Sequence, residues 1–119
     1  MDMKSYADLL AETKGRIKEI GVKDLMALRH TTGDVVIVDV REQHEYNLGT
    51  IPGALTIGRS NLEKNVEAQV PRDKTVILFC SSGNRSAFAA EQLHKMGYEH
   101  VRSLREGFSG WVAEGGEVE

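Results

Sequence analysis

One stretch decides the fold of this chain: Thr75-Val76-Ile77-Leu78-Phe79-Cys80-Ser81-Ser82-Gly83-Asn84-Arg85-Ser86-Ala87-Phe88-Ala89-Ala90. The apolar, β-branched run up to Phe79 predicts a buried strand, and the alanine-rich end predicts a helix. A short, glycine-containing loop joins them, and the chain's one cysteine, Cys80, stands at the hinge. Backbone amides at a helix N-terminus and the nearby Arg85 guanidinium both favour a thiolate over a thiol. Cys80 is therefore a candidate nucleophile.

Strand and helix patterns alternate on both sides of this stretch. We expect strands at 17–20, 35–39, 54–57, 75–79 and 100–104, and helices at 5–17, 22–29, 42–47, 60–66, 84–96 and 108–114. The run from Val35 to Val38 is continuously β-branched, which is typical of a parallel strand buried on both faces. The pattern predicts an α/β fold with three layers, a mainly parallel central sheet carrying helices on both faces.

The expected helices show where they should pack. Tyr6, Leu9, Leu10 and Ile17 recur near helical spacing in the first helix. Ala87, Ala90, Leu93 and Met96 should point inward from the helix at 84–96, as should Trp111 from the last helix. We divide the chain into an N-terminal helical extension, residues 1–16, and one domain, residues 17–119.

Composition narrows the classes of function. The 119 residues carry a formal net charge of -3, which gives no electrostatic reason to expect nucleic acid or an anionic membrane as a partner. No apolar run approaches the roughly 18 residues that span a bilayer, and the first ten residues lack the apolar core of a signal peptide. A lone cysteine cannot form an intrachain disulfide and fits a reducing compartment. We therefore expect a soluble, cytoplasmic protein.

The loop after Cys80 has the make-up of an anion-binding nest. Four residues separate Cys80 from Arg85, so the loop amides can curl around the sulfur, and Gly83 permits the backbone angles that this curl needs. Ser81, Ser82 and Ser86 can add hydroxyl donors, and Arg85 can hold an oxyanion or neutralise a thiolate. Such a site suits an anionic substrate attacked through sulfur.

Plainer interpretations stand beside this one. Cys80 can be a small, inert core residue, because free cysteine is commonly buried. Gly83 alone can serve a turn, and Ser82 or Asn84 alone can cap a helix. The four histidines are scattered, so neither a Cys–His dyad nor a metal site is expected.

Three blocks of sequence resemble the single-domain form of the rhodanese (thiosulfate sulfurtransferase) family. The first is Val38-Asp39-Val40-Arg41 with Glu45-Tyr46 and Gly49-Thr50-Ile51-Pro52-Gly53-Ala54; the second is Phe79 to Ala87; the third is Leu104-Arg105-Glu106-Gly107-Phe108 with Trp111 and Gly115-Gly116-Glu117-Val118. Any one block is weak, but their order and spacing together are specific. The resemblance covers about residues 17–119.

The resemblance implies a persulfide relay without a cofactor or a metal. Cys80 would take the outer sulfur of a small anionic donor such as thiosulfate and pass it to a thiol, including a protein thiol, or to cyanide. The loop from Ser81 to Ser86 would bind the donor and stabilise the persulfide, with Arg85 holding the anion. Asp39 and Arg41 would support the loop from the neighbouring strand end through an ion pair or hydrogen bonds; alternatively they form an ordinary solvated pair.

The chain departs from the family pattern at three positions. Thr50 stands where the family often has His, which we interpret as a difference in turn packing. Glu106 stands where a glycine is frequent, and this would place an acid near the pocket mouth, where it could tune the choice of acceptor. Ser81 stands where some members have a basic residue that binds thiosulfate, so thiosulfate need not be the physiological donor.

Other functions remain open from the sequence. Cysteine-dependent phosphatases and arsenate reductases also have an arginine after the cysteine, but with five intervening residues rather than four. A rhodanese-like module that only binds a partner is another alternative, although such modules commonly lose the cysteine. The helix at 5–17 could also mediate dimerisation, but packing on its own domain is simpler.

Overall fold

The computed structural model describes residues 3–31 and 33–119, and its centre is a five-stranded parallel sheet. The strands are β1 (Lys18–Ile20), β2 (Val35–Asp39), β3 (Leu55–Thr56), β4 (Thr75–Phe79) and β5 (Val101–Leu104). Their order is β1-β5-β4-β2-β3, and every neighbouring pair runs parallel. The α/β fold class is confirmed, and β4, the strand that precedes Cys80, lies in the middle of the sheet.

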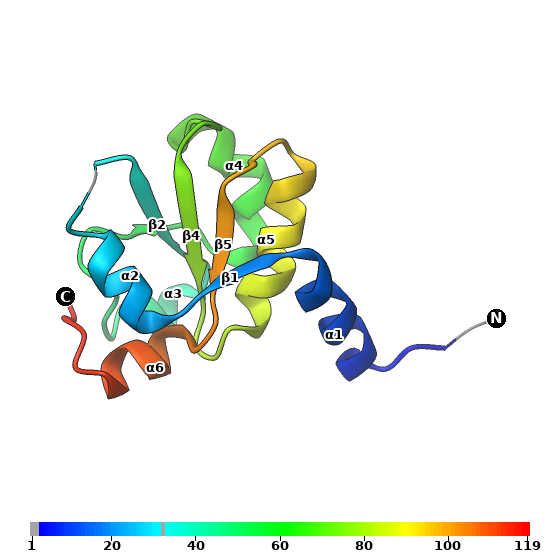
Figure 1. Ribbon diagram of the computed structural model, residues 1–119, viewed down its shortest axis with the longest axis horizontal. Helices are drawn as coiled ribbons and strands as arrows, with labels where there is room; N and C mark the ends of the chain where they lie inside the picture. The colour runs from blue at the N-terminus through cyan, green and yellow to red at the C-terminus, as the bar shows by residue number, and fades with distance from the viewer. Residues whose placement is uncertain (1–2, 32) are drawn as a thin grey trace.

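Helices cover both faces of this sheet (Figure 1). They are α1 (Tyr6–Arg16), α2 (Val22–Leu28), α3 (Gln43–Tyr46), a 3-10 turn η1 (Arg59–Asn61), α4 (Leu62–Gln69), α5 (Asn84–Lys95) and α6 (Gly107–Ala113). Helices α4 and α5 lie on one face, and α2 and α6 on the other. The helix expected at 60–66 runs later and longer as α4, because it continues until Val70, which precedes Pro71 and is therefore biased toward an extended backbone.

The side chains of the apolar strand β4 pack into two hydrophobic clusters, one on each face of the sheet. Val76 and Leu78 pack into the cluster under α4 and α5, whereas Ile77 and Phe79 pack into the cluster under α2 and α6. Successive side chains of a strand point to opposite faces, so a strand covered on both sides carries apolar residues at consecutive positions. Trp111 is fully buried in the second cluster, as expected.

Helix α5 positions the loop that follows Cys80. Ala87, Ala90 and Leu93 are fully buried and Met96 is partly buried against the first cluster, which confirms the predicted inward face. The helix contacts both β4 and β5, so its N-terminus is held directly beyond the end of the central strand.

Helix α1 does not bury the apolar face that its sequence suggests. Ser5 and Asp8 form a capping box that starts the helix, but Tyr6 and Leu9 are 61% and 45% exposed, and Thr13 is its one buried residue. The helix packs on α5 through the Tyr6 ring, 6.0 Å from that of Phe88, and through polar contacts with Glu91. A division of the chain at residue 16 remains a prediction. Within the described residues, no helix has the length and apolarity that a membrane span requires.

Candidate functional site

The predicted site residues gather where β2, β4 and β5 end, at the lower edge of the sheet in Figure 1. The register pairs Asp39 with Phe79, so Val40 and Cys80 leave neighbouring strands at the same level, and Arg41 follows one residue later. In parallel sheets the carboxyl ends of the strands form the usual binding edge. The structure therefore brings the first two blocks of sequence together, as predicted.

The sulfur of Cys80 takes the place of a helix cap. Helix α5 begins after Gly83 without a side-chain cap, and neither Ser82 nor Asn84 caps it. Instead, Sγ accepts hydrogen bonds from the amides of Gly83 and Ser86, both at 3.3 Å. Ser86 is the third residue of α5, whose amide a capping oxygen ordinarily binds. Cys80 is 1% exposed, and its sulfur lies at the N-terminal, positive end of the α5 helix dipole.

Helix α6 fixes the direction of the loop backbone. The amides of Phe108 and Ser109 donate to the carbonyls of Cys80 and Ser81, at 2.8 and 3.1 Å. These carbonyls therefore point away from the sulfur toward α6. The approach depends on Gly107, which has a φ of +65°, because a Cβ there would lie 2.4 Å from the Ser81 carbonyl oxygen.

Gly83 also allows a close backbone approach, in this case between the loop and the residue that follows β5. Its φ is +92°, in the left-handed region that glycine tolerates best, and a Cβ there would lie 2.3 Å from the carbonyl oxygen of Arg105. The predicted role of Gly83 in the curl is consistent with this geometry. The loop is thus held between the start of α6 and the end of β5.

A chain of buried hydroxyls leads away from the sulfur. The Ser86 Oγ lies 3.5 Å from Cys80 Sγ and 2.7 Å from the Oγ of Ser103, which is fully buried on β5. In the structure the Cys80 thiol donates to the Ser86 Oγ. Because a hydroxyl both donates and accepts, Ser86 can instead donate to a sulfur that carries no proton, such as the inner sulfur of a persulfide, with Ser103 donating to Ser86.

Arg85 is bound by a carboxylate. Its Nη1 and Nη2 donate to Glu45 Oε2 and Oε1 at 2.7 and 2.8 Å, and Nη2 also lies 3.3 Å from the Ser81 Oγ. Ser81 in turn donates to Glu45 at 3.2 Å, so two loop side chains converge on α3. Hydrogen bonding to Arg85 lowers the pKa of Glu45 to about 2, against the effect of burial. The sequence predicted that Arg85 binds an oxyanion in a bidentate manner; in this structure it binds the Glu45 carboxylate in that way.

Arg85 also remains within electrostatic reach of the sulfur. Its pKa is raised, first by the hydrogen bond to Glu45, with a smaller electrostatic contribution from Cys80. The side chain is 39% exposed, so solvent reaches it.

Asp39 and Arg41 form a buried pair rather than a solvated one. Arg41 donates to both carboxylate oxygens of Asp39 from Nε and Nη2, at 2.8 to 3.2 Å, and Asp39 is fully buried. The guanidinium also donates to the Gly49 carbonyl at 2.6 Å, and its Cζ lies 4.3 Å from the ring centre of Phe108. The predicted ion pair is present, and it links β2 to the start of α6.

Two of the departures from the family pattern have structural roles that the sequence did not predict. Thr50 donates to Asp39 at 2.9 Å and pairs through its backbone with Glu119, so it does more than change the packing of a turn. Glu106 accepts from the amide of Val22 at 3.0 Å, at the start of α2, where Gly21 offers no side chain. The carboxylate of Glu106 therefore caps α2, and its expected influence on the choice of acceptor stays a prediction.

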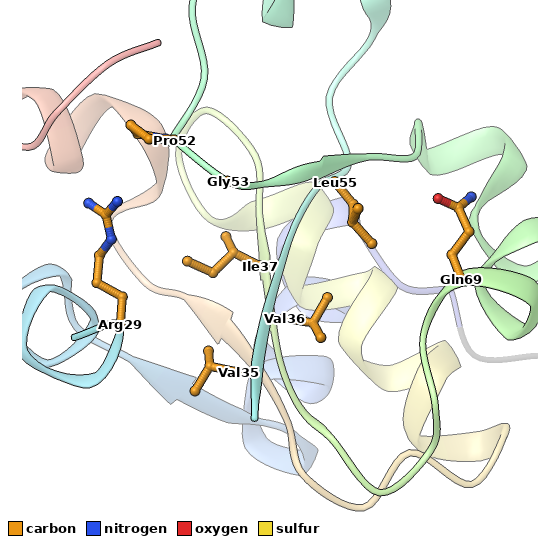
Figure 2. A pocket seen from close by; sticks show the side chains of 8 residues that line it. All are labelled: Arg29, Val35, Val36, Ile37, Pro52, Gly53, Leu55 and Gln69. Atoms are coloured by element: carbon orange, nitrogen blue, oxygen red, sulfur yellow. The ribbon is translucent and has the colours of Figure 1, made fainter. Parts of the chain in front are cut away.

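A pocket of about 450 Å³ lies away from these residues (Figure 2). It is formed at the start of β2, the end of α2 and the turn before β3, and its lining includes Arg29, Val35, Pro52 and Gln69. None of the predicted site residues lines it. Among the described residues, no group of three His, Cys, Asp or Glu side chains is placed to hold a metal ion.

Sequence reasoning missed three parts of the site. Glu45 stands in the first block, but no spacing rule pairs it with a loop forty residues later. Ser103 appeared only as one residue of a strand, and Gly107 only as part of a family pattern. The one available signal for Ser103 was a polar residue at an inward position of a buried strand.

Comparisons with known proteins identify the family of this chain. The family model described as Rhodanese-like domain matches residues 22–114. A sulfurtransferase of Allochromatium vinosum is 33% identical over 99 residues, which cover 83% of this chain and 92% of that protein. The thiosulfate sulfurtransferase GlpE of Pseudoalteromonas translucida is 35% identical over 80 residues, which cover 67% of this chain and 75% of the relative.

Solved structures share the fold. A protein of unknown function from Rhodopseudomonas palustris, described as a possible tyrosine phosphatase, superposes with a TM-score of 0.89 at 32% identity, covering 100% of this chain and 97% of that one. A rhodanese-related protein from Thermoplasma volcanium superposes with a TM-score of 0.77 at 30% identity, covering 86% and 97%.

Proposed function

Because the chain belongs to the rhodanese-like domain family, we propose that it is a sulfurtransferase that carries sulfur as a persulfide on Cys80. The observation that carries the proposal is the sulfur in the position of a helix cap, with two amides and a hydroxyl around it. Such surroundings suit a negatively charged or acceptor-only sulfur. The relatives described as sulfurtransferases support the same chemistry.

The transfer has two steps. The Cys80 thiolate attacks the outer sulfur of the donor; an Sγ–S bond forms, the S–S bond of the donor breaks, and its electron pair leaves on sulfite when the donor is thiosulfate. A nucleophile, either a thiolate or cyanide, then attacks the outer sulfur of the persulfide. The Sγ–S bond breaks, and the electron pair returns to Cys80 as thiolate. No external oxidant or reductant is needed.

We assign the following roles to the predicted residues. Cys80 is the nucleophile, the amides of Gly83 and Ser86 and the Ser86 hydroxyl stabilise Sγ, and the remaining amides between Ser81 and Arg85 stabilise the outer sulfur. Asp39 and Arg41 are positioning residues, because they bind each other and the segments beside the loop.

The loop argues against a phosphatase. Four residues lie between Cys80 and Arg85, so the ring of amides is one residue shorter than the phosphatase loop. The guanidinium that would hold a phosphoryl group is engaged by Glu45. The possible phosphatase assignment given to the Rhodopseudomonas palustris protein nevertheless makes p-nitrophenyl phosphate a necessary test substrate.

Mass spectrometry of the intact protein tests the proposal. Wild type incubated with thiosulfate, mercaptopyruvate or an alkyl persulfide should gain one sulfur atom that cyanide removes, and Cys80→Ser should gain none. A wild type that gains no removable sulfur from any donor would favour a binding module. Hydrolysis of p-nitrophenyl phosphate without sulfur transfer would favour the phosphatase.

A further inference from the structure

The arginines around the site are all matched by acids. Arg41, Arg59, Arg85 and Arg105 follow strands β2, β3, β4 and β5, respectively. Each has a carboxylate within 4 Å: Asp39 at 2.8 Å, Glu63 at 2.6 Å, Glu45 at 2.7 Å, and Glu19 and Glu106 at 3.7 and 3.9 Å. Within the described residues, no arginine at this edge of the sheet offers an uncompensated positive charge to an incoming anion.

The Arg85 pair matters most, because Arg85 is the cation of the cysteine loop. Glu45 takes two of its N–H groups in a bidentate arrangement, the strongest geometry for such a pair. A guanidinium has five N–H donors, so Arg85 can still hydrogen-bond a substrate. The positive charge of Arg85 is cancelled, however, because a Cys80 thiolate, Arg85 and Glu45 together carry a net charge of about -1.

This balance penalises a donor according to its charge. Thiosulfate arrives as a dianion, whereas an organic thiosulfonate or an alkyl persulfide brings one negative charge or none. Each additional negative charge on the donor meets the charge of Glu45 within a few ångströms of Arg85, in a half-exposed site where Coulomb repulsion is reduced but not abolished.

We infer that Glu45 determines the donor class, and that the site favours donors with at most one negative charge over dianionic thiosulfate. The inference rests on the proposed sulfur transfer and specifies its substrate. For an alkyl persulfide RS–SH, Cys80 thiolate forms the new Sγ–S bond, the RS–SH bond breaks, and the thiol leaves as RS⁻ with its electron pair. Glu45 acts through Arg85 and is a specificity-determining residue rather than a catalytic one.

Two chemically matched donors isolate the effect of charge. Thiosulfate and methanethiosulfonate (CH3–SO2–S⁻) both transfer a sulfur bound to a sulfonyl-type group, but the second has a methyl group in place of one O⁻. Initial rates with cyanide as acceptor give kcat/KM for each donor, and the ratio of the two cancels changes in the nucleophile. In Glu45→Gln this ratio, thiosulfate over methanethiosulfonate, should rise roughly threefold to tenfold.

Three controls separate charge from structure. Glu45→Asp keeps the charge with altered geometry and should leave the ratio within about twofold of wild type. Glu99→Gln makes the same change in net charge at an exposed position after α5 and should leave it unchanged. In wild type itself, raising the ionic strength should increase the ratio, because salt screens the additional repulsion on the dianion; this readout needs no variant to fold.

The outcomes are distinct. A ratio unmoved by Glu45→Gln, or one that falls with salt in wild type, overturns the assignment of Glu45 while leaving sulfur transfer intact. A ratio that rises equally in Glu45→Asp assigns the effect to geometry and also overturns it. If neither these donors nor an alkyl persulfide loads Cys80 in any variant, the proposed function fails and the inference fails with it.

Discussion

Replacing Asp39 by asparagine should destabilise the whole domain. The carboxylate is fully buried and receives hydrogen bonds from Arg41 and from Thr50. Asparagine has nearly the same shape but no charge, and its amide group places two N–H donors where an acceptor is needed. Arg41, 4% exposed, would then keep its charge with no anion beside it, and only the Gly49 carbonyl and one asparagine oxygen could accept from it.

The magnitude follows from burial. Removing one partner of a buried ion pair costs roughly 3–5 kcal/mol, because the other charge is left unpaired. Asparagine retains one acceptor oxygen, so we expect the lower end, about 3 kcal/mol. That is a large fraction of the roughly 5–15 kcal/mol that holds a domain folded. With a urea m-value of about 2 kcal/mol/M, the midpoint of unfolding should fall by about 1.5 M.

Urea unfolding followed by circular dichroism measures this directly for wild type, Asp39→Asn and the double variant Asp39→Leu/Arg41→Met. Removing both charges leaves no unpaired ion, so the double variant should be more stable than Asp39→Asn. A loss below about 0.5 kcal/mol in Asp39→Asn would show the pair to be solvated. A double variant less stable than Asp39→Asn would refute the argument from an unpaired buried charge.

Three further outcomes are expected. Gly107→Ala should weaken both folding and persulfide loading, since its Cβ would press on the Ser81 carbonyl oxygen at 2.4 Å; unchanged loading and melting temperature would contradict this. The pKa of Glu45 is lowered from 4.5 to about 2, so its pair with Arg85 stabilises the fold fully above pH 4.5 and loses that effect as the pH falls through 2. The stability difference between wild type and Glu45→Gln, from thermal melts at pH 2 to 6, should therefore shrink toward acid. Ser103→Ala should shorten the lifetime of the Cys80 persulfide several-fold with little change in melting temperature, as measured by mass spectrometry over time.

Much of the fold was readable because each signal was local. The unbroken β-branched run of β2 predicted burial on both faces, and its side chains, which alternate between the two core clusters, confirm that interpretation. Helix α1 was the weakest prediction, since Tyr6 and Leu9 stand at helical spacing and yet remain largely exposed. Its contacts with α5 are largely polar, and apolar spacing alone could not predict them.

The site was readable only as far as it is continuous in sequence. Cys80, Gly83 and Ser86 lie within seven consecutive residues, so the curl of the loop could be predicted from its length and its glycine. The partner of Arg85 could not be predicted in this way, because Glu45 lies in α3, which follows the neighbouring strand β2. The prediction that Arg85 holds an oxyanion considered the loop alone, and the charge of the site depends on what surrounds the loop.

The geometry gives a physical reason why three separate blocks of sequence occur together. The first supplies Glu45, which holds Arg85, and Arg41, whose guanidinium stacks on Phe108. The third supplies Gly107, without which α6 could not approach closely enough to take the loop carbonyls. Only when those carbonyls are bound on the outside are the amides left to surround the sulfur. Each block is weak alone because none of them makes the site, and a substitution in the first or third should alter the chemistry of Cys80 without touching it.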